Sequence, residues 1–104
     1  MVDAIDRIGQ VTDGRSVDDY RKDWIVRDAV ERNIGRLSEA SRRLPDAFRA
    51  AHPTLPWNRI ADIDNALRHA CVDVDDSVIW TVATEHLVPL RSAVLDVIGG
   101  GDIE

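Results

Sequence analysis

Apolar residues recur every three or four positions along most of the chain, which is the spacing of one face of an α-helix. A first stripe predicts a short helix that ends near Gly14, where glycine can take a left-handed conformation. A second stripe predicts a long helix that begins at a Ser16 cap and runs to about Arg43. Its outer surface is expected to carry three opposite-charge pairs four residues apart, Asp23–Arg27, Asp28–Arg32 and Glu39–Arg43.

Prolines divide the second half of the chain. Pro45 can open a short helix through Ala51, and Pro56 can open another that ends between residues 69 and 71. A last helix begins at an Asp76 or Ser77 cap and ends at the glycines of 99–101, with Pro89 predicting a kink near Glu85 or His86. Strand patterns are nearly absent. The chain is therefore expected to form one all-α domain over residues 1–104, an antiparallel bundle of four main helices plus one short helix.

Composition narrows the function classes. A chain of 104 residues with 44% hydrophobic residues suits one domain. The single cysteine, Cys71, excludes an internal disulfide, and the histidines at 52, 69 and 86 do not have metal-ligand spacing, so no metal and no cofactor are expected. Acidic residues near Met1 and the lack of a long apolar run predict no signal peptide and no membrane, hence a cytoplasmic protein.

The formal net charge of −6 argues against a surface that is basic all over, but residues 21–49 carry eight basic and five acidic side chains. Arg32, Arg36 and Arg43 share one helix face and could contact phosphates. Neighbouring carboxylates favour a solvated, paired face equally well. The three tryptophans, Trp24, Trp57 and Trp80, fall on apolar helix faces, where a core or a helix contact is expected rather than a base-stacking platform.

Potential catalytic side chains are densest around the end of the helix that follows Pro56. This cluster comprises Asp62, Asp64, Asn65, Arg68, His69, Asp73, Asp75 and Asp76. Its aspartates lack the glycine and the terminal glutamate of a calcium loop, so a metal site is not expected. The same residues also fit ordinary roles as helix caps and arginine partners, which is the commoner outcome for such helix ends.

Several fragments together resemble the HepT-like branch of the HEPN superfamily. They are Ala29–Ile34, Glu39-Ala40, Leu55-Pro56-Trp57 with Ile60, Asn65–His69, Val74-Asp75 with Trp80, and Leu87–Leu90. The resemblance implies a helical bundle that forms a homodimer and a metal-independent ribonuclease that acts as a toxin on tRNA or mRNA. It also implies a minimal nucleotidyltransferase as the antitoxin partner.

The family motif consists of an arginine, an asparagine, a histidine and, two positions later, a tyrosine that the antitoxin modifies. Asn65 and His69 match this motif, whereas Asp64 stands in the place of the arginine and Cys71 in the place of the tyrosine. RNA cleavage without metal needs groups that move two protons and a cation beside the phosphate. An aspartate near that phosphate is expected to reverse the sign of the interaction, and Cys71 is not expected to accept a nucleotide.

Two hypotheses follow. In the first, His69 and Asn65 form a composite site across a dimer, Arg32, Arg36 and Arg68 bind RNA, and Asp64 leaves cleavage weakened or lost. In the second, the chain is a non-catalytic dimeric interaction module that binds the nucleotidyltransferase. Whether the chain is an enzyme is therefore open at this point.

Overall fold

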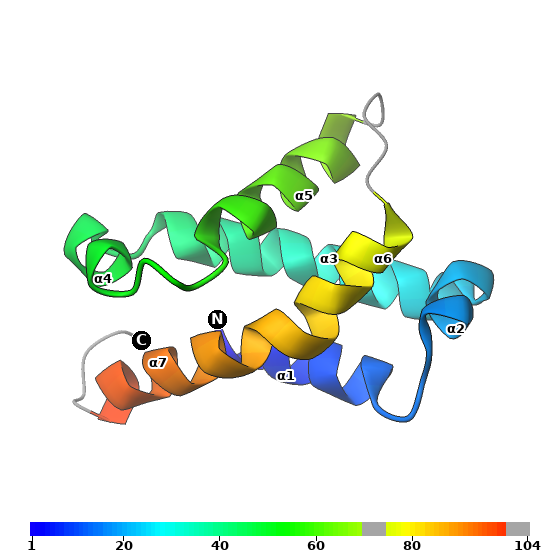
Figure 1. Ribbon diagram of the computed structural model, residues 1–104, viewed down its shortest axis with the longest axis horizontal. Helices are drawn as coiled ribbons and strands as arrows, with labels where there is room; N and C mark the ends of the chain where they lie inside the picture. Colours follow the sequence, from blue (N-terminus) through cyan, green and yellow to red (C-terminus); the bar gives the residue numbers. More distant parts are fainter. Residues whose placement is uncertain (70–74, 100–104) are drawn as a thin grey trace.

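A computed structural model describes residues 1–69 and 75–99, and the regular structure within these ranges is entirely helical. The elements are α1 (Val2–Thr12), α2 (Val17–Lys22), α3 (Trp24–Arg42), α4 (Asp46–Ala51), α5 (Trp57–His69), α6 (Asp76–Thr81), the π-helix η1 (Val82–His86) and α7 (Leu87–Gly99). The direction of the chain alternates between α1, α3, α5 and the continuous α6–η1–α7 rod (Figure 1). The predicted all-α bundle is confirmed. In the part of the chain described, no helix is both long and apolar enough to cross a membrane.

The predicted long second helix is wrong in one respect, because it breaks at Asp23. Asp23 has an extended backbone, with φ −99° and ψ 103°, and its carboxylate accepts a hydrogen bond from the Ile25 N–H at 3.0 Å. This side chain caps α3 and so competes with helix continuation, which separates α2 from α3. The expected Asp23–Arg27 pair is therefore absent. The predicted cap at Ser16 is confirmed as a reciprocal capping box with Asp19.

Trp24 does not belong to the core. It is the first residue of α3 and is 69% exposed, because the break at Asp23 interrupts the apolar stripe that was expected to run on from Tyr20. Trp57 and Trp80 agree with their predicted placement, since both are partly buried and pack against the core. The Trp57 indole N–H also donates to the carbonyl oxygen of His52 at 2.9 Å.

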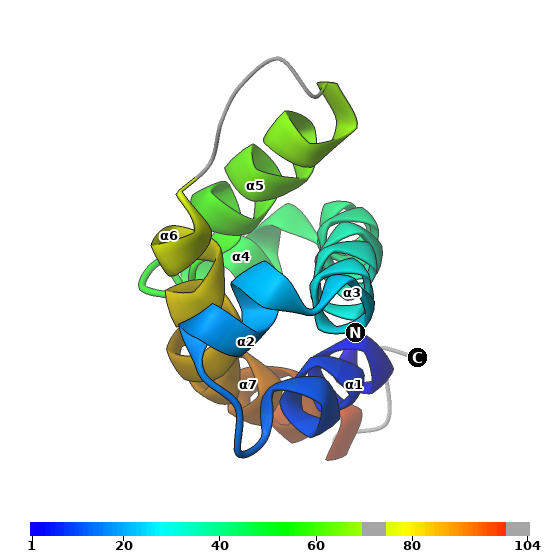
Figure 2. The same ribbon diagram turned by 90° about the vertical axis from the view of Figure 1, so that its right-hand side faces the viewer.

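Helix α3 is the central element of the bundle. Figure 2 shows it nearly end-on, with α1 on one side and α5 on the other, and both helices pack against it. Its buried stripe includes Val30, Ile34 and Leu37, each fully buried, and α5 contributes Ile60 and Ile63. Burying large aliphatic side chains is the main favourable term in such packing. The position of α5, and of the polar residues it carries, is thus set by its contact with α3.

The predicted disturbance before Pro89 takes the form of the π-helix η1 over Val82–His86. Proline cannot donate to the carbonyl one turn earlier, and a π-turn accommodates the shift in hydrogen-bond register that results. Pro89 itself is exposed, as the kink prediction required.

A partly buried polar network joins α2, α3 and α6. The Tyr20 hydroxyl donates to Glu31 at 2.9 Å, and Arg27 lies 4.7 Å from the centre of the Tyr20 ring while it pairs with Asp76 at 2.9 Å. Burial, and next the negative charge of Glu31, raise the pKa of the Tyr20 hydroxyl above its ordinary value. Tyr20 therefore acts as a neutral donor that ties the three helices together.

The stability of the protein should fall as the pH rises above about 10, the pKa of an unfolded tyrosine. The folded-state pKa is raised, so the stabilisation is complete below that pH and is lost as the pH rises toward the folded pKa, by up to about 1.4 kcal/mol per pH unit. Tyr20 is the only tyrosine, so Tyr20→Phe should remove this component of the slope. Urea unfolding of both proteins at pH 8 to 11 measures it, and equal slopes would contradict the prediction.

Candidate functional site

A groove runs between α3 and α5, and its lining includes four arginines and four carboxylates. One hollow of about 470 Å³ is lined by Arg32, Gly35, Arg36, Glu39, Ala40, Arg43, Asp64 and Arg68. An adjoining hollow of about 310 Å³ shares Arg32, Asp64 and Arg68 and adds Asp28, Glu31 and Leu67. We call the two hollows together the α3–α5 groove. The three arginines predicted to bind RNA, Arg32, Arg36 and Arg68, all line its larger hollow, where four arginines face two carboxylates.

The state of the α3 arginines decides between the two interpretations of this helix face. Arg32 and Arg36 form no ion pair with any carboxylate of residues 1–69 and 75–99. The expected Asp28–Arg32 pair is not formed, whereas Glu39–Arg43 is present at 3.5 Å. Two exposed guanidinium groups in one groove therefore keep all their donors for a ligand, and this favours anion binding over a fully paired face.

Asp64 lies at the inner wall of the groove and is only 3% exposed. One carboxylate oxygen, Oδ2, accepts a hydrogen bond from Arg42 Nη2 at 3.0 Å and lies 3.2 Å from Arg68 Nη2. The other oxygen, Oδ1, lies 3.4 Å from the position that a Cβ atom on Gly35 would occupy, so α3 passes close by. A buried carboxylate is costly unless cations compensate it, and here two guanidinium groups do so.

Arg42 is the residue that the sequence analysis missed. It ends α3 and reaches back to Asp64 on α5, and its Nη1 also pairs with Glu39 at 2.9 Å. Arg42 and Asp64 are 22 residues apart, so no helical spacing in the sequence indicates that they pair. The four-residue spacing of Asp64 and Arg68, in contrast, is the ordinary spacing of a helical ion pair.

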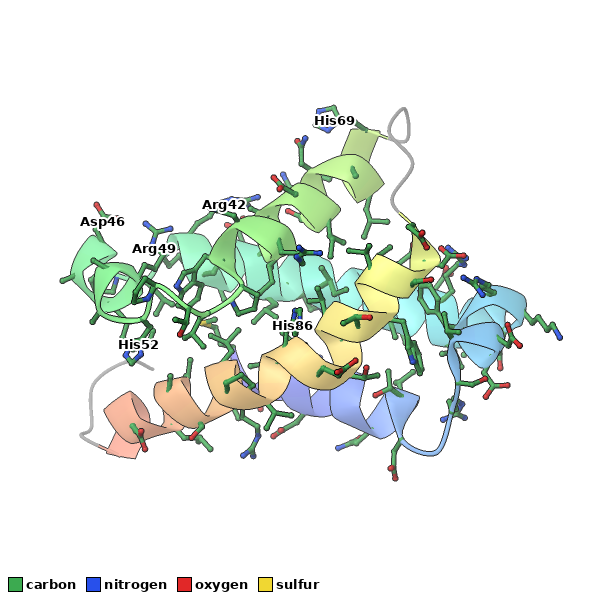
Figure 3. All side chains as sticks on the ribbon, viewed as in Figure 1. Arg42, Asp46, Arg49, His52, His69 and His86 are labelled. Carbon is green, nitrogen blue, oxygen red and sulfur yellow. The ribbon has the colours of Figure 1, made fainter. Side chains whose placement is uncertain are left out.

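His69 is the last residue of α5, and its ring projects away from the bundle, whereas Arg42 lies lower, between α3 and α5 (Figure 3). His69 Nδ1 is 2.8 Å from the carbonyl oxygen of Asn65. A carbonyl oxygen can only accept, so Nδ1 carries the proton in the neutral ring and Nε2 keeps a free lone pair. His69 and Asn65 are both exposed and neither lines the α3–α5 groove. Within one chain, the structure thus separates the predicted proton-transfer group from the predicted RNA-binding arginines.

Other members of the polar cluster have structural roles. Asp75 caps α6 by accepting from the Ser77 N–H at 2.8 Å, and this hydrogen bond lowers the pKa of Asp75. Asp76 pairs with Arg27 at 2.9 Å. Cys71 and Asp73 lie outside the described residues. Among residues 1–69 and 75–99, no three metal-ligating side chains come together.

A larger concavity, of about 770 Å³, lies elsewhere, between α1 and the η1–α7 rod. Arg91 and Asp6 pair at its edge at 2.6 Å, and the hydrogen bond from Arg91 lowers the pKa of Asp6. It contains none of the predicted site residues, and its charged groups already include this matched pair. The α3–α5 groove is therefore the better candidate for a charged ligand.

Comparison with known proteins gives a consistent assignment. A family model described as "Ribonuclease HepT-like" matches residues 1–97. The chain is 31% identical over 91 residues to the "Probable ribonuclease HepT" of Thermococcus cleftensis, covering 88% of this chain and 83% of that protein. It is 29% identical to a "Putative RNase" of Caldanaerobacter subterraneus, covering 82% of this chain and 76% of the relative.

A third relative is longer than this chain. It is the "Gamma-glutamylcyclotransferase and putative RNase" of Methanocaldococcus jannaschii, 27% identical over 93% of this chain but over only 44% of its own length. No solved structure matches the chain.

The surroundings of Asp64 predict the effect of placing an arginine at this position. Asp64→Arg should lower the free energy of unfolding by about 3 kcal/mol, because a third guanidinium would replace the carboxylate that pairs with both Arg42 and Arg68. Adding Arg42→Asp should recover about half of the loss by re-forming an opposite-charge pair. Urea denaturation of the two variants measures both effects.

The matched control is Arg49→Asp in the Asp64→Arg background, since Arg49 pairs with Asp46 on α4, outside the groove. This control should recover nothing. An Asp64→Arg variant as stable as the wild type would contradict the assigned role of Asp64.

Proposed function

The chain belongs to the ribonuclease HepT-like family of the HEPN superfamily, and on that premise we propose that it binds single-stranded RNA in the α3–α5 groove and cleaves it slowly, without metal. The observation that carries this proposal is the convergence of Arg32, Arg36 and Arg68 in one groove. Arginine forks match phosphate oxygens, and unpaired arginines such as Arg32 and Arg36 gain affinity by releasing counterions from RNA. A relative is itself described as a ribonuclease HepT.

Cleavage in this proposal depends on His69. Its Nε2 lone pair can accept the proton of the ribose 2′-hydroxyl, while the Nδ1 contact with the carbonyl oxygen of Asn65 holds the ring in the required tautomer. A second imidazole has to protonate the leaving oxygen. Since His69 projects from the end of α5, the second imidazole would come from another copy of the chain. The proposal therefore includes a homodimer, and HEPN family proteins typically dimerise.

The rate is expected to be low because the residue at the motif arginine position is Asp64. Losing one donor that stabilises transition-state charge typically costs two to three powers of ten in rate. The proposal also includes the toxin role and a minimal nucleotidyltransferase antitoxin as the partner, as the family suggests. Cys71 stands where that partner would modify a tyrosine, so control by nucleotide transfer at this position is not expected.

His69→Ala should abolish cleavage of single-stranded RNA in the presence of EDTA. The wild type should cleave slowly and leave 2′,3′-cyclic phosphate ends, because the 2′-hydroxyl is the attacking group. Gel analysis of a labelled oligonucleotide measures the rate, and a 2′-deoxy substrate is the chemical control. His52→Ala is the matched histidine control and should leave cleavage intact, since His52 lies at the end of α4 and stacks on Phe48. Equal cleavage by wild type and His69→Ala would refute the role of His69.

Arg32→Gln and Arg36→Gln should each weaken RNA binding by about tenfold at low salt, because each variant removes one guanidinium that contacts phosphate. Fluorescence anisotropy with a single-stranded oligonucleotide measures the dissociation constant. Each loss should lower the slope of log K against log salt concentration by about 0.7. Arg59→Gln is the control, because Arg59 lies on α5 but lines a different hollow, with His86 and Pro89. A loss at Arg59 equal to that at Arg32 would contradict the choice of groove.

One observation favours a second candidate function. Asp64 is buried and pairs with Arg42 and Arg68, so its carboxylate is not accessible to exchange a proton with a substrate. A non-catalytic dimer that binds a nucleotidyltransferase would show this arrangement too. Complete absence of metal-independent cleavage by the purified chain, together with a stable complex with such a partner in size-exclusion chromatography, would support this second function over the first.

A further inference from the structure

The replacement of a motif arginine by aspartate need not place negative charge in the groove. Asp64 is 3% exposed, while the side chains of its two partners, Arg42 and Arg68, are 46% and 54% exposed. The carboxylate is thus covered and the cations are at the surface. Glu39 also pairs with Arg42, so Arg68 is the cation of this cluster that lines the groove and that a ligand there can touch.

Arg68 is the more available of the two partners. Among the described residues its only ionic contact is Nη2 with Asp64, and a guanidinium group offers five N–H donors. Arg42 is held on two sides, by Asp64 and by Glu39. Arg68 also lines both hollows of the groove, next to the unpaired Arg32. It can therefore keep its contact with Asp64 and still donate to a second anion.

We propose that Asp64 is a positioning residue, which holds the Arg68 guanidinium over the α3–α5 groove so that Arg68, Arg32 and Arg36 bind the phosphates of an RNA strand. Asp64 does not touch RNA in this arrangement. Arg42 compensates part of the Asp64 charge and anchors the carboxylate to the end of α3. This inference rests on the proposed function for the identity of the ligand, but it assigns to Asp64 the opposite effect from the one that its charge alone predicts.

The energetic reason is the entropy of a long side chain. A free arginine on a helix surface samples many rotamers. It loses this conformational entropy when it binds a phosphate in one of them. An ion pair with a fixed, buried carboxylate restricts Arg68 before the ligand arrives. Because Asp64 pairs with both Arg42 and Arg68, its repulsion of a phosphate is offset by the attraction of these two guanidinium groups.

Asp64→Asn separates this proposal from simple electrostatics. If only net charge mattered, removing a negative charge from the groove would tighten the binding of a polyanion. The proposal predicts that a labelled single-stranded oligonucleotide binds Asp64→Asn about fivefold more weakly than wild type, since the neutral amide holds Arg68 poorly. Tighter or unchanged binding by a folded Asp64→Asn protein would overturn it.

A second variant avoids dependence on the stability of Asp64→Asn. Arg68→Lys keeps the positive charge and leaves Asp64 paired with Arg42, but loses the planar fork. It should weaken RNA binding about threefold, and Arg68→Gln about tenfold, with unchanged circular dichroism. Arg59→Lys and Arg59→Gln are the matched controls on the same helix and should have no effect. Wild-type affinity in Arg68→Lys and Arg68→Gln would overturn the proposal even if Asp64→Asn failed to fold.

The two proposals fail in different ways. If the wild-type chain does not bind the oligonucleotide at all, the proposed function fails and the role of Asp64 fails with it. If Arg32→Gln and Arg36→Gln weaken binding but Asp64→Asn tightens it, the groove is correct and only the positioning role is refuted. A double variant, Asp64→Asn with Arg68→Gln, should bind no more weakly than Arg68→Gln alone, because Asp64 acts through Arg68. If the two substitutions weakened RNA binding additively, Asp64 would not act through Arg68.

Discussion

A single buried carboxylate links α3 to α5 beside their apolar contact. Asp64 can remain 3% exposed only because Arg42 and Arg68 reach it with guanidinium nitrogens at 3.0 and 3.2 Å. One of these arginines ends α3 and the other lies one turn further along α5, so the pairing holds the two helices at a particular offset. That offset brings Arg32 and Arg36 opposite Arg68. The same interaction that compensates a buried charge thus also builds the basic wall of the groove.

The helical fold could be predicted from the sequence because its signals are local. The apolar stripe of α5, the capping box at Ser16 and the disturbance before Pro89 each depend on residues within one or two turns. The break at Asp23 was missed because two local preferences compete there. The apolar spacing from Tyr20 to Trp24 favours a continuous helix, whereas the Asp23 side chain caps the backbone and ends it. The exposure of Trp24 is the consequence.

The sequence predicts that Arg32, Arg36 and Arg68 bind one ligand, and the structure brings these three together. The sequence does not predict Arg42 or the separation of His69 from the three arginines. The shared helix face of Arg32 and Arg36 can be read from spacing, as can the pairing of Asp64 with Arg68. Whether Asp64 meets a phosphate directly depends on its burial and on Arg42, 22 residues earlier in the chain. Neither quantity is encoded in a local pattern. A negative residue in the sequence can therefore be buried between cations in three dimensions.

Binding and cleavage place different demands on this site. Phosphate binding needs cations at the surface of the groove, and Arg32, Arg36 and Arg68 meet that need from two helices. Cleavage also needs a cation at the one phosphate that gains charge in the transition state, within reach of His69. In one chain His69 does not line the groove, because it projects from the last turn of α5. An arginine that Asp64 holds toward α3 is thus well placed to bind a phosphate of the RNA and poorly placed to stabilise the transition state of cleavage beside His69. In the proposed function, an aspartate at position 64 is therefore expected to affect the rate constant of cleavage far more than the affinity for RNA.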